Sequence, residues 1–502
     1  MNVFRENKLP EEFRRLASES LGAEAAGMLF ERIGKGKGYS CIRFNPAKLP
    51  VAGAVSRDAA DNASALFGDK VPVPVKWAPY GFYLKERPLF TLDPLFHAGV
   101  YYVQEASSMY MDLVAEAIEK AYGKGKSEKR FFEGPLRALD LCAAPGGKTT
   151  HLLSLLNKDS LLVSNEVIKS RAVVLAENVA RWGTAQAMVT QNDPKDFSTL
   201  EETFHLVVVD APCSGEGLFG KDPEAIGEWS VANVKLCRER QKRILADIWP
   251  AVKPGGFLVY STCTYNRLEN DGNVAFLVEE LGAEQVTLEI SPDSGILATE
   301  RGGMQFVPGL VKGEGQFVAL LRKPVREGDD LWRSLSAGAS RRAGRSGSPV
   351  GKPGSGGRGN SSGGKETACG FLPEGCIQLF RGDLVKGYPA ALAEDIFFFE
   401  NRLRVILSGI AVATQKGRDF IPHPDLAMLP VLPGGLNRVE VSRGDALKFL
   451  AREPLVFPGQ PLGFLLLTYR GHGLGFVKNI GSRSNNLLPM ARRIRMGISE
   501  GD

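Results

Sequence analysis

The sequence predicts an α/β fold built on a doubly wound, mostly parallel sheet, and three observations lead to this class. Between residues 136 and 323, short apolar runs alternate with stretches of helical periodicity. Several runs are apolar throughout, which is typical of parallel strands covered by helices on both faces. Glycines, carboxylates or cysteines follow these runs directly, and open parallel sheets bind ligands at such carboxyl ends.

Seven segments of this region are expected to form strands. They are RALDLCA (137–143), LLVSNEV (161–167), QAMVTQ (186–191), FHLVVVDAP (204–212), GFLVYSTC (256–263), QVTLEI (285–290) and GQFVALLRK (315–323). A helix is expected between the fourth and fifth strands, where apolar residues recur at helical spacing. These residues are Ile244, Leu245, Ile248, Trp249 and Val252. The following KPGG sequence (253–256) is expected to end that helix.

Three further regions surround the expected catalytic domain, which spans residues 131–325. Residues 1–130 contain an amphipathic start, YSCIRFNPAK (39–48), and a turn that enters a helix within HAGVYYVQEASSMYMDLVAEAI (97–118). Residues 326–368 include a segment rich in Gly, Ser and Arg, Ser334 to Glu366, that lacks the apolar surface needed to fold. We expect a flexible linker there. Residues 369–502 are strand-rich, with turns at LPGG and RGHG, and are expected to form an accessory β-barrel or α/β domain.

The composition excludes several classes of protein. The chain has 502 residues and a net charge of +5, which permits an anionic partner without requiring one. It has no apolar run of about 18 residues and no signal-like start, so we expect no membrane segment and a cytoplasmic location. Its seven cysteines include no C-x-x-C pair, and its five histidines no H-x3-H group. We therefore expect no metal site, and free thiols that are available for chemistry.

The turn within ALDLCAAPGGKTTHLL (138–153) is the first candidate site. A P-loop needs a glycine five positions before Gly147, where Cys142 stands, and G-x-G-x-x-G is absent. A close backbone approach without phosphate remains, because the glycines remove Cβ groups and the helix start offers N–H groups to a carboxylate. The expected binding loop consists of Cys142, Ala143, Ala144, Pro145, Gly146, Gly147 and Lys148.

Two carboxylates at the ends of the next strands extend this site. Glu166 follows the second strand, where it can accept hydrogen bonds from ribose hydroxyls. Asp193 follows the third strand, where it can accept a hydrogen bond from the amino group of adenine. A carboxylate, a ribose and an adenine without phosphate are the parts of S-adenosylmethionine, which is the expected cofactor. The alternative is that both acids are solvated loop residues.

Two cysteines follow the fourth and fifth strands. Cys213 comes after Asp210 and Pro212, and Cys263 ends the fifth strand. Adjacent parallel strands lie about 5 Å apart, so both thiols can share one cleft. A thiolate that adds to carbon 6 of an unstacked cytosine activates carbon 5 for methylation, after which a base removes the carbon 5 proton and the thiol leaves.

The residues alone do not rank the two thiols. Asp210 is expected to hydrogen-bond the polar edge of the pyrimidine and to lie against the cofactor. The alternative is that each cysteine is a small apolar residue buried in the core, without a chemical role.

Five motifs in this order resemble the Sun-type family of RNA (cytosine-5)-methyltransferases. They are GVYYVQEASSM, LDLCAAPGGKTTHL, NEVIKSRAVVLAENVARWG, DAPCSGEGLF and KPGGFLVYSTCTYNRLEND, and they lie between residues 99 and 271. The C-terminal extension resembles the bacterial RsmF-like branch of that family. The resemblance implies a class I S-adenosylmethionine-dependent methyltransferase fold, an N-terminal RNA-binding module and a PUA-like C-terminal region.

The resemblance also implies roles for single residues. Loop 142–148, Glu166, Asp193 and Asp210 would contact S-adenosylmethionine. Cys263 would be the nucleophile, and Cys213 would promote release of the product. DNA cytosine methyltransferases use the cysteine of the PC motif instead, so that class predicts Cys213 as nucleophile. Arg43 and Lys48 would contact RNA phosphates, and a surface role unrelated to RNA is the alternative for this pair.

The branch resemblance implies 16S rRNA as the substrate, with transfer RNA as the second candidate. Naked RNA and the assembled small ribosomal subunit both stay open as the form that is recognised, and a monomer is expected. A hypothesis from a different class is a non-catalytic RNA-binding or ribosome assembly factor on the same scaffold.

Overall fold

The computed structural model describes residues 9–36, 38–49, 73–123, 130–329, 331 and 369–497. The expected linker segment, Ser334 to Glu366, lies outside the described residues. Within the described ranges, no helix is long and apolar enough to cross a membrane. The same ranges contain no group of three His, Cys, Asp or Glu side chains that could hold a metal ion.

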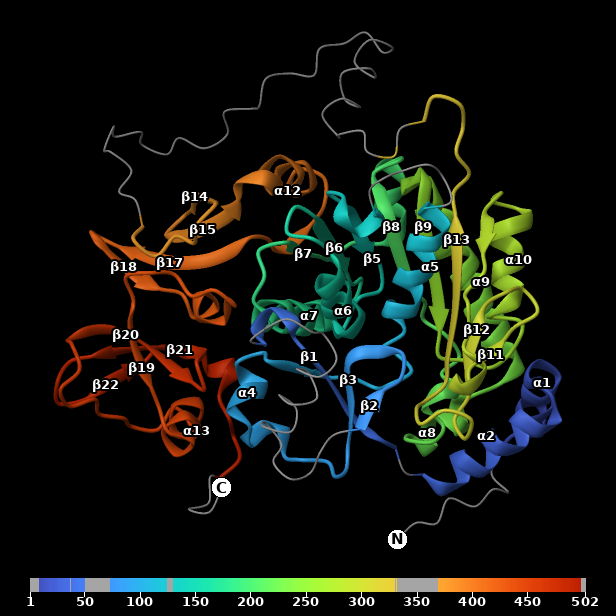
Figure 1. Cartoon of the computed structure of the whole chain (residues 1–502), viewed down its shortest axis with the longest axis horizontal. Helices are drawn as coiled ribbons and strands as arrows, with labels where there is room; N and C mark the ends of the chain where they lie inside the picture. Colours follow the sequence, from blue (N-terminus) through green and yellow to red (C-terminus); the bar gives the residue numbers. More distant parts are fainter. Residues whose placement is uncertain are drawn as a thin grey trace.

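A single large sheet organises the molecule (Figure 1). Its strand order is β11-β12-β13-β9-β8-β5-β6-β7-β16, and β10 pairs with β13. The strands of the first half are β5 (Arg137–Asp140), β6 (Leu161–Asn165), β7 (Ala187–Thr190), β8 (Phe204–Asp210) and β9 (Val252–Thr262). The others are β10 (Glu284–Val286), β11 (Leu297–Ala298), β12 (Met304–Phe306), β13 (Gln316–Arg322) and β16 (Val405–Leu407).

Strands β5 to β9 are parallel, and the remaining strands are antiparallel to their neighbours. The doubly wound, mostly parallel fold is therefore confirmed.

Helices cover both faces of this sheet because successive side chains of each strand alternate between two apolar clusters. Leu162 belongs to the cluster that includes α5 (Met111–Gly123), α6 (Gly147–Leu155) and α7 (Lys169–Trp182). Leu161 and Val163 belong to the opposite cluster, with α9 (Val231–Ile248) and α10 (Asp271–Glu279). A helix on each face leaves the carboxyl ends of the parallel strands as the open edge of the sheet.

The helix before β9 is shorter than its apolar spacing predicts. It ends at Ile248, a short 3-10 turn follows (Trp249–Ala251), and Val252 is already the first residue of β9. The KPGG sequence therefore lies inside the strand. Gly255 has φ 75°, and the register with β8 shifts between Phe204 and Leu206, so the glycines form a bulge. The prediction that KPGG ends this helix is therefore wrong, because the helix already ends at Ile248, before a 3-10 turn that contains Pro250.

The N-terminal region forms a helical hairpin and a small antiparallel sheet. The hairpin consists of α1 (Glu11–Leu21) and α2 (Ala23–Lys35). The sheet has the order β2-β3-β1-β4, with β1 (Ser40–Phe44), β2 (Val73–Val75), β3 (Ala78–Leu84) and β4 (Tyr101–Val103). A short helix, α4 (Pro94–His97), precedes β4, and the predicted turn then leads into α5.

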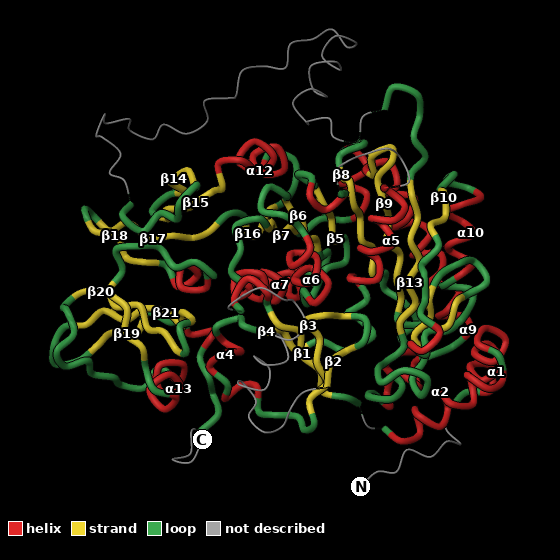
Figure 2. The backbone as a smooth tube through the Cα atoms, in the orientation of Figure 1, coloured by secondary structure: helices red, strands yellow, loops and turns green. Residues whose placement is uncertain are grey.

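The C-terminal region contains two four-stranded sheets. One consists of β14 (Cys376–Arg381), β15 (Leu384–Pro389), β17 (Ile410–Lys416) and β18 (Asp419–Pro422), with α12 (Ala393–Glu400) between β15 and β17. The other consists of β19 (Asn437–Glu440), β20 (Gly463–Tyr469), β21 (His472–Asn479) and β22 (Ser484–Asn486), with α13 (Arg443–Ala451). The predicted RGHG turn connects β20 and β21, whereas LPGG lies in the loop before β19. Figure 2 shows the strands of this second sheet close to α13.

The C-terminal region packs against the catalytic sheet and contributes one strand to it. Strand β16 pairs with β7 and so forms the outer edge of the large sheet. Phe399 of α12 stacks on Phe204 of β8, with ring centroids 5.5 Å apart. Phe449 of α13 belongs to the same apolar cluster as Phe44 of β1. The three parts of the chain therefore bury apolar surface against one another.

Candidate active site

Every residue that the sequence placed at a strand end lies at the same edge of the large sheet. The loop from Cys142 to Lys148 follows β5, Glu166 follows β6, and Asp193 comes shortly after β7. Asp210 ends β8, and Cys263 follows β9 directly. Because β5 to β9 are parallel neighbours, this sequence of loops forms one continuous edge.

The two predicted thiols are adjacent at this edge. Cys213 Sγ and Cys263 Sγ are 3.0 Å apart, and both side chains are partly exposed free cysteines. The hydrogen bond with Cys263 and burial together raise the pKa of the Cys213 thiol well above its ordinary value. Cys213 therefore keeps its proton at neutral pH and can donate it to the sulfur of Cys263.

Two buried carboxylates, which the sequence analysis did not single out, hold the cysteine loops together. Glu216, three residues after Cys213, accepts hydrogen bonds from the backbone N–H groups of Tyr265 (2.7 Å) and Asn266 (3.2 Å). Glu269, six residues after Cys263, accepts a hydrogen bond from the backbone N–H of Ser214 (3.0 Å). Burial raises the pKa of Glu216 to about 7 and raises that of Glu269 as well.

Further hydrogen bonds complete this connection. The side chain of Asn266 donates to both carboxylates, at 2.8 Å each, and the Gly217 N–H donates to the carbonyl of Cys263 at 2.7 Å. The only signal in the sequence was the acidic residues near each cysteine, Glu216 in CSGEG and Glu269 with Asp271 in NRLEND. An acid in a turn is ordinarily solvated, so this signal was weak.

Asp210 is held by a polar network at the carboxyl end of β8. Lys148 Nζ donates to it at 2.8 Å and Ser261 Oγ at 2.7 Å, and Tyr110 in turn donates to Ser261 at 2.8 Å. Burial alone would lower the pKa of Lys148, but the charge of Asp210 outweighs burial and the pKa is raised. The Lys148 ammonium therefore stays charged, and the Asp210 side chain remains 31% exposed.

The predicted binding loop has the geometry of a close backbone approach. Gly146 has φ 113°, and a Cβ there would lie 3.2 Å from Leu175 Cδ1. No side chain caps α6, which begins at Gly147, so its first N–H groups are free for a ligand. Asn178 Nδ2 and the Tyr102 hydroxyl donate to the Pro145 carbonyl at 2.7 and 3.2 Å, which fixes the loop.

The two predicted acidic contacts both use part of their carboxylate to shape their own loops. Glu166 is buried, accepts a hydrogen bond from the Ile168 N–H at 3.0 Å and pairs with Arg171 at 3.3 Å. Asp193 is the N-cap of a 3-10 helix and accepts a hydrogen bond from the Lys195 N–H at 3.1 Å. A carboxylate has about four acceptor sites, so each retains capacity for a ligand hydroxyl or amino group.

These groups fit S-adenosylmethionine better than a phosphate ligand. Lys148 is the only cationic residue in loop 142–148, and Asp210 holds it. The loop therefore presents backbone N–H groups rather than free positive charge. Beneath it, Asp140 Oδ1 is buried without a hydrogen-bond partner among the described residues, and burial raises the Asp140 pKa to about 7. Burial also raises the pKa of the Cys142 thiol, which suits a packing role rather than a nucleophilic one.

The prediction that Arg43 and Lys48 contact RNA phosphates is wrong. Arg43 is 1% exposed and donates to Gln104 (2.8 Å), Thr150 (2.6 Å) and Ser154 (3.1 Å). Lys48 is 6% exposed and donates to the carbonyls of Ala98 and Arg181.

The alternative of a surface role fails as well, because both side chains are enclosed. Burial lowers the pKa of Arg43 to about 9 and that of Lys48 to about 7. Arg43 joins β1 to helix α6, and Lys48 joins the N-terminal region to the end of α7, so both hold that region against the cofactor side of the sheet.

The parallel sheet, the glycine loop after β5 and the acid after β6 define a class I S-adenosylmethionine-dependent methyltransferase. Three family models match the chain: "16S rRNA methyltransferase RsmB/F" at residues 134–322, "N-terminal domain of 16S rRNA methyltransferase RsmF" at 9–106 and "Methyltransferase RsmF PUA domain" at 436–494. The chain belongs to the RsmF family of 16S rRNA methyltransferases.

Individual relatives agree with this assignment. The Ribosomal RNA small subunit methyltransferase F of Aeromonas hydrophila is 31% identical over 482 residues, which covers 89% of this chain and 90% of the relative. The protein of the same name from Shewanella baltica is 32% identical and covers 83% and 84%.

Solved structures share the fold. A methyltransferase homologue from Pyrococcus horikoshii is similar with a TM-score of 0.51 and 26% identity, over 62% of this chain and 95% of the other. NSun6 from the same organism, crystallised with SFG, has a TM-score of 0.50 and 20% identity over 62% and 98% of the two chains.

Proposed function

We propose that this protein transfers a methyl group from S-adenosylmethionine to carbon 5 of a cytidine in 16S rRNA. The observation that carries the proposal is the pair of thiols, 3.0 Å apart, at the ends of the strands next to the cofactor loop. A binding protein needs neither this pair nor the buried carboxylates that position it. The names of the relatives, small subunit methyltransferase F, support ribosomal RNA as the substrate.

In this proposal Cys263 is the nucleophile. Its thiolate forms a bond to carbon 6 of the cytosine, and electron density moves to carbon 5. Bound S-adenosylmethionine supplies the electrophilic methyl group that carbon 5 receives. A base then removes the proton from carbon 5, the double bond re-forms, and the bond between Cys263 and carbon 6 breaks. The leaving sulfur departs as a thiolate, which the proton of Cys213 stabilises.

The remaining predicted site residues orient the reactants. Asp210 accepts a hydrogen bond from the polar edge of the pyrimidine, and Lys148 holds the Asp210 side chain in place. Glu166 accepts hydrogen bonds from the ribose hydroxyls of the cofactor, and Asp193 accepts one from the adenine amino group. The N–H groups at the start of α6 donate to the carboxylate of the cofactor. We place the cofactor across residues 142–148 for these reasons.

The proposal includes a division of the chain. An N-terminal RNA-binding module (1–130) and a PUA-like extension (369–502) flank the catalytic domain (131–325), with a flexible linker at 326–368. The flanking parts supply phosphate contacts, which position RNA without reading its sequence and weaken as salt rises. The enzyme acts as a monomer in the cytoplasm, and its partner is 16S rRNA, offered either as naked RNA or within the small ribosomal subunit.

The test uses purified protein, labelled S-adenosylmethionine, and 16S rRNA offered as naked RNA and as small subunits from a strain that lacks the enzyme. Bisulfite sequencing then locates the methylated cytidine. Cys263→Ala is expected to lose activity by more than about 10³-fold, because the nucleophile is gone. Cys213→Ala is expected to accumulate a covalent protein–RNA species, visible as a slowed gel band.

A matched control is Cys376→Ala, which removes a partly exposed thiol of the C-terminal sheet and leaves both results unchanged. Full turnover by Cys263→Ala would refute the nucleophile assignment. Methylation of transfer RNA alone would refute the substrate assignment, and absence of S-adenosylmethionine binding in an isothermal titration would favour a non-catalytic scaffold.

A further inference from the structure

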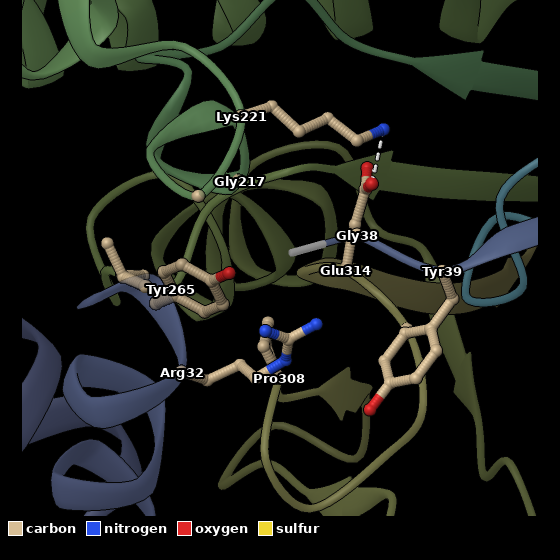
Figure 3. A pocket seen from close by; sticks show the side chains of 11 residues that line it. Arg32, Gly38, Tyr39, Gly217, Lys221, Tyr265, Pro308 and Glu314 are labelled. Carbon is tan, nitrogen blue, oxygen red and sulfur yellow. Dashed lines mark ion pairs between the residues drawn. The ribbon is translucent and has the colours of Figure 1, made fainter. Parts of the chain in front are cut away.

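A pocket beside the cysteine loops has no part in the mechanism above (Figure 3). We call it the N-terminal pocket. It is a shallow, solvent-open pocket, and the space of about 430 Å³ among its lining residues includes open solvent. Its lining includes Arg32, Tyr39, Gly217, Gly220, Tyr265 and the Lys221–Glu314 ion pair.

The pocket is joined directly to the proposed nucleophile. Tyr265 stands two residues after Cys263 in the chain, and its side chain lines the pocket. Gly217, another lining residue, donates its N–H to the Cys263 carbonyl at 2.7 Å. A Cβ at Gly217 would lie 2.7 Å from that carbonyl oxygen, so the two loops are in close contact. A group bound in the pocket therefore lies against the two loops that carry Cys213 and Cys263.

The chemistry of the pocket suits a nucleotide. The Arg32 guanidinium lies 5.1 Å from the centroid of the Tyr39 ring, and Tyr39 is 42% exposed. Among the described residues no carboxylate lies within ion-pair distance of Arg32, whereas Lys221 pairs with Glu314. The pocket thus combines a cation that has no carboxylate partner among the described residues with a partly exposed tyrosine ring, over which that guanidinium lies. Unstacked RNA bases stack on such rings and guanidinium planes, and arginine binds phosphate.

The pocket is also preformed. The α1–α2 hairpin packs on the segment that follows Cys213, with Phe13 and Phe219 ring centroids 4.9 Å apart. Phe13 lies 6.4 Å from the Tyr265 ring in the same apolar cluster, which includes Phe30 and Ile33 of α2. The position of Arg32 relative to the Cys263 loop is therefore fixed by a shared core. Figure 3 shows the Arg32 side chain between Tyr265 and Tyr39, with the Lys221–Glu314 pair above them.

We propose that the N-terminal pocket binds the nucleotide that adjoins the target cytidine, with its base on Tyr39 and Arg32 and its phosphate at Arg32. The inference rests on the proposed function. A cytidine that enters the active site leaves the stack, so its neighbour loses a stacking partner. Tyr39 and Arg32 replace that partner, and the N-terminal region thereby selects RNA that is unstacked at the reaction site.

Steady-state kinetics with 16S rRNA and small subunits test the inference. Arg32→Ala and Tyr39→Ala are each expected to raise KM for RNA about tenfold, the usual effect of losing one stacked base. The kcat at saturating RNA and the KM for S-adenosylmethionine stay at wild-type values. Tyr39→Phe keeps the ring and restores the KM.

Gly220→Leu provides an independent variant, since a Cβ at Gly220 meets no atom within 4 Å and its φ is not positive. The leucine occupies pocket space without disturbing the protein, and it raises KM for RNA in the same way. Arg15→Ala is the matched control, because Arg15 is an exposed residue of the same hairpin that pairs with Glu19. Unchanged KM for RNA in both Arg32→Ala and Gly220→Leu would overturn the inference.

Cross-linking locates the neighbour directly. The covalent adduct of the Cys213→Ala protein is first mapped on the RNA, and 4-thiouridine is then placed on either side of the target. One of the two positions is expected to cross-link to the peptide that contains Tyr39 or to that of Tyr265. If the adduct forms but both positions cross-link only elsewhere, the pocket assignment is wrong while the proposed function stands. If no RNA gives an adduct, the proposed function and this inference both fall.

Discussion

Glu216 and Glu269 each bind the loop that carries the other. Glu216 belongs to the Cys213 loop and accepts the Tyr265 N–H of the Cys263 loop at 2.7 Å. Glu269 belongs to the Cys263 loop and accepts the Ser214 N–H of the Cys213 loop at 3.0 Å. This exchange fixes the 3.0 Å between the two thiols more firmly than strand pairing alone, because the cysteines lie beyond the hydrogen-bonded strands.

Glu216→Gln is expected to lower kcat about 10- to 100-fold, since small displacements of a reacting group cost that much. Both oxygens of Glu216 accept hydrogen bonds, from donors that include Tyr265, Asn266 and Trp229. In either orientation of the glutamine amide, its NH2 group therefore faces hydrogen-bond donors and those bonds are lost. The measurement is the rate of adduct formation in the Cys213→Ala background, with KM for RNA unchanged. Glu239→Gln, at a largely exposed carboxylate on α9, is the control. A wild-type adduct rate in Glu216→Gln would show that the exchange is not needed to place Cys263.

Glu166→Ala is expected to raise the Kd for S-adenosylmethionine about 10- to 100-fold, because hydrogen bonds to a charged acceptor are worth more than neutral ones. Isothermal titration without RNA measures this affinity apart from catalysis. Glu166→Gln retains one acceptor oxygen and falls between the two proteins. Glu177→Gln, an exposed residue of α7, leaves the Kd unchanged. Equal affinity of Glu166→Ala and wild type would remove Glu166 from the cofactor site.

Asp140→Asn is expected to gain stability relative to the wild type as pH rises. Burial raises the Asp140 pKa from 3.8 to about 7, so the folded protein holds a proton that the unfolded chain has already released between these values. The contribution of Asp140 to the unfolding free energy therefore falls as pH rises through this window and levels off above about 7.

The asparagine variant lacks this titration. Its unfolding free energy, measured by urea denaturation, shifts by about 2 kcal/mol relative to wild type between about pH 5.5 and about pH 7.5. Asp159→Asn, at an exposed loop position, shows no such shift. A constant difference between Asp140→Asn and wild type across this range would mean that Asp140 is not protonated in the folded state.

Proteolytic cleavage within the expected linker, residues 334–366, is expected to leave the two fragments associated. Strand β16 pairs with β7, and Phe399 stacks on Phe204, so the fragments share a sheet and a core. Size-exclusion chromatography of the cleaved protein checks this expectation. Phe399→Ala is expected to cost about 3–5 kcal/mol of stability, because Phe399 is fully buried. Separation of the cleaved wild-type fragments under native conditions would contradict the shared core.

The strand ends could be predicted because each is a local property of the chain. An apolar run followed by a polar turn marks the end of a buried strand, and this placed Glu166, Asp210 and Cys263 correctly. The parallel order then follows from helices between strands. The adjacency of Cys213 and Cys263 needed only that β8 and β9 be neighbours.

What the sequence did not predict depends on distant contacts. Arg43 and Lys48 look like surface cations, yet their partners, such as Thr150 and Arg181, lie more than a hundred residues away. Glu216 stands in a turn whose composition is typical of solvated turns, and Asn266 contacts it only in the folded protein. Strand β16 consists of three residues, too few to show the alternation of apolar and polar residues that predicts a strand. It is a strand because it pairs with the edge strand β7.

That three-residue strand limits how the protein can be taken apart. Without Val405 to Leu407, the outer side of β7 would present bare peptide groups to solvent, an invitation to mispairing with another chain. An engineer who wishes to exchange the terminal domain for a different reader should therefore join the new module near residue 436, where the PUA match begins, and keep residues 369 to 435 with the catalytic body. A fusion made at residue 369 would remove β16 and expose the edge of β7, which other chains could then pair with.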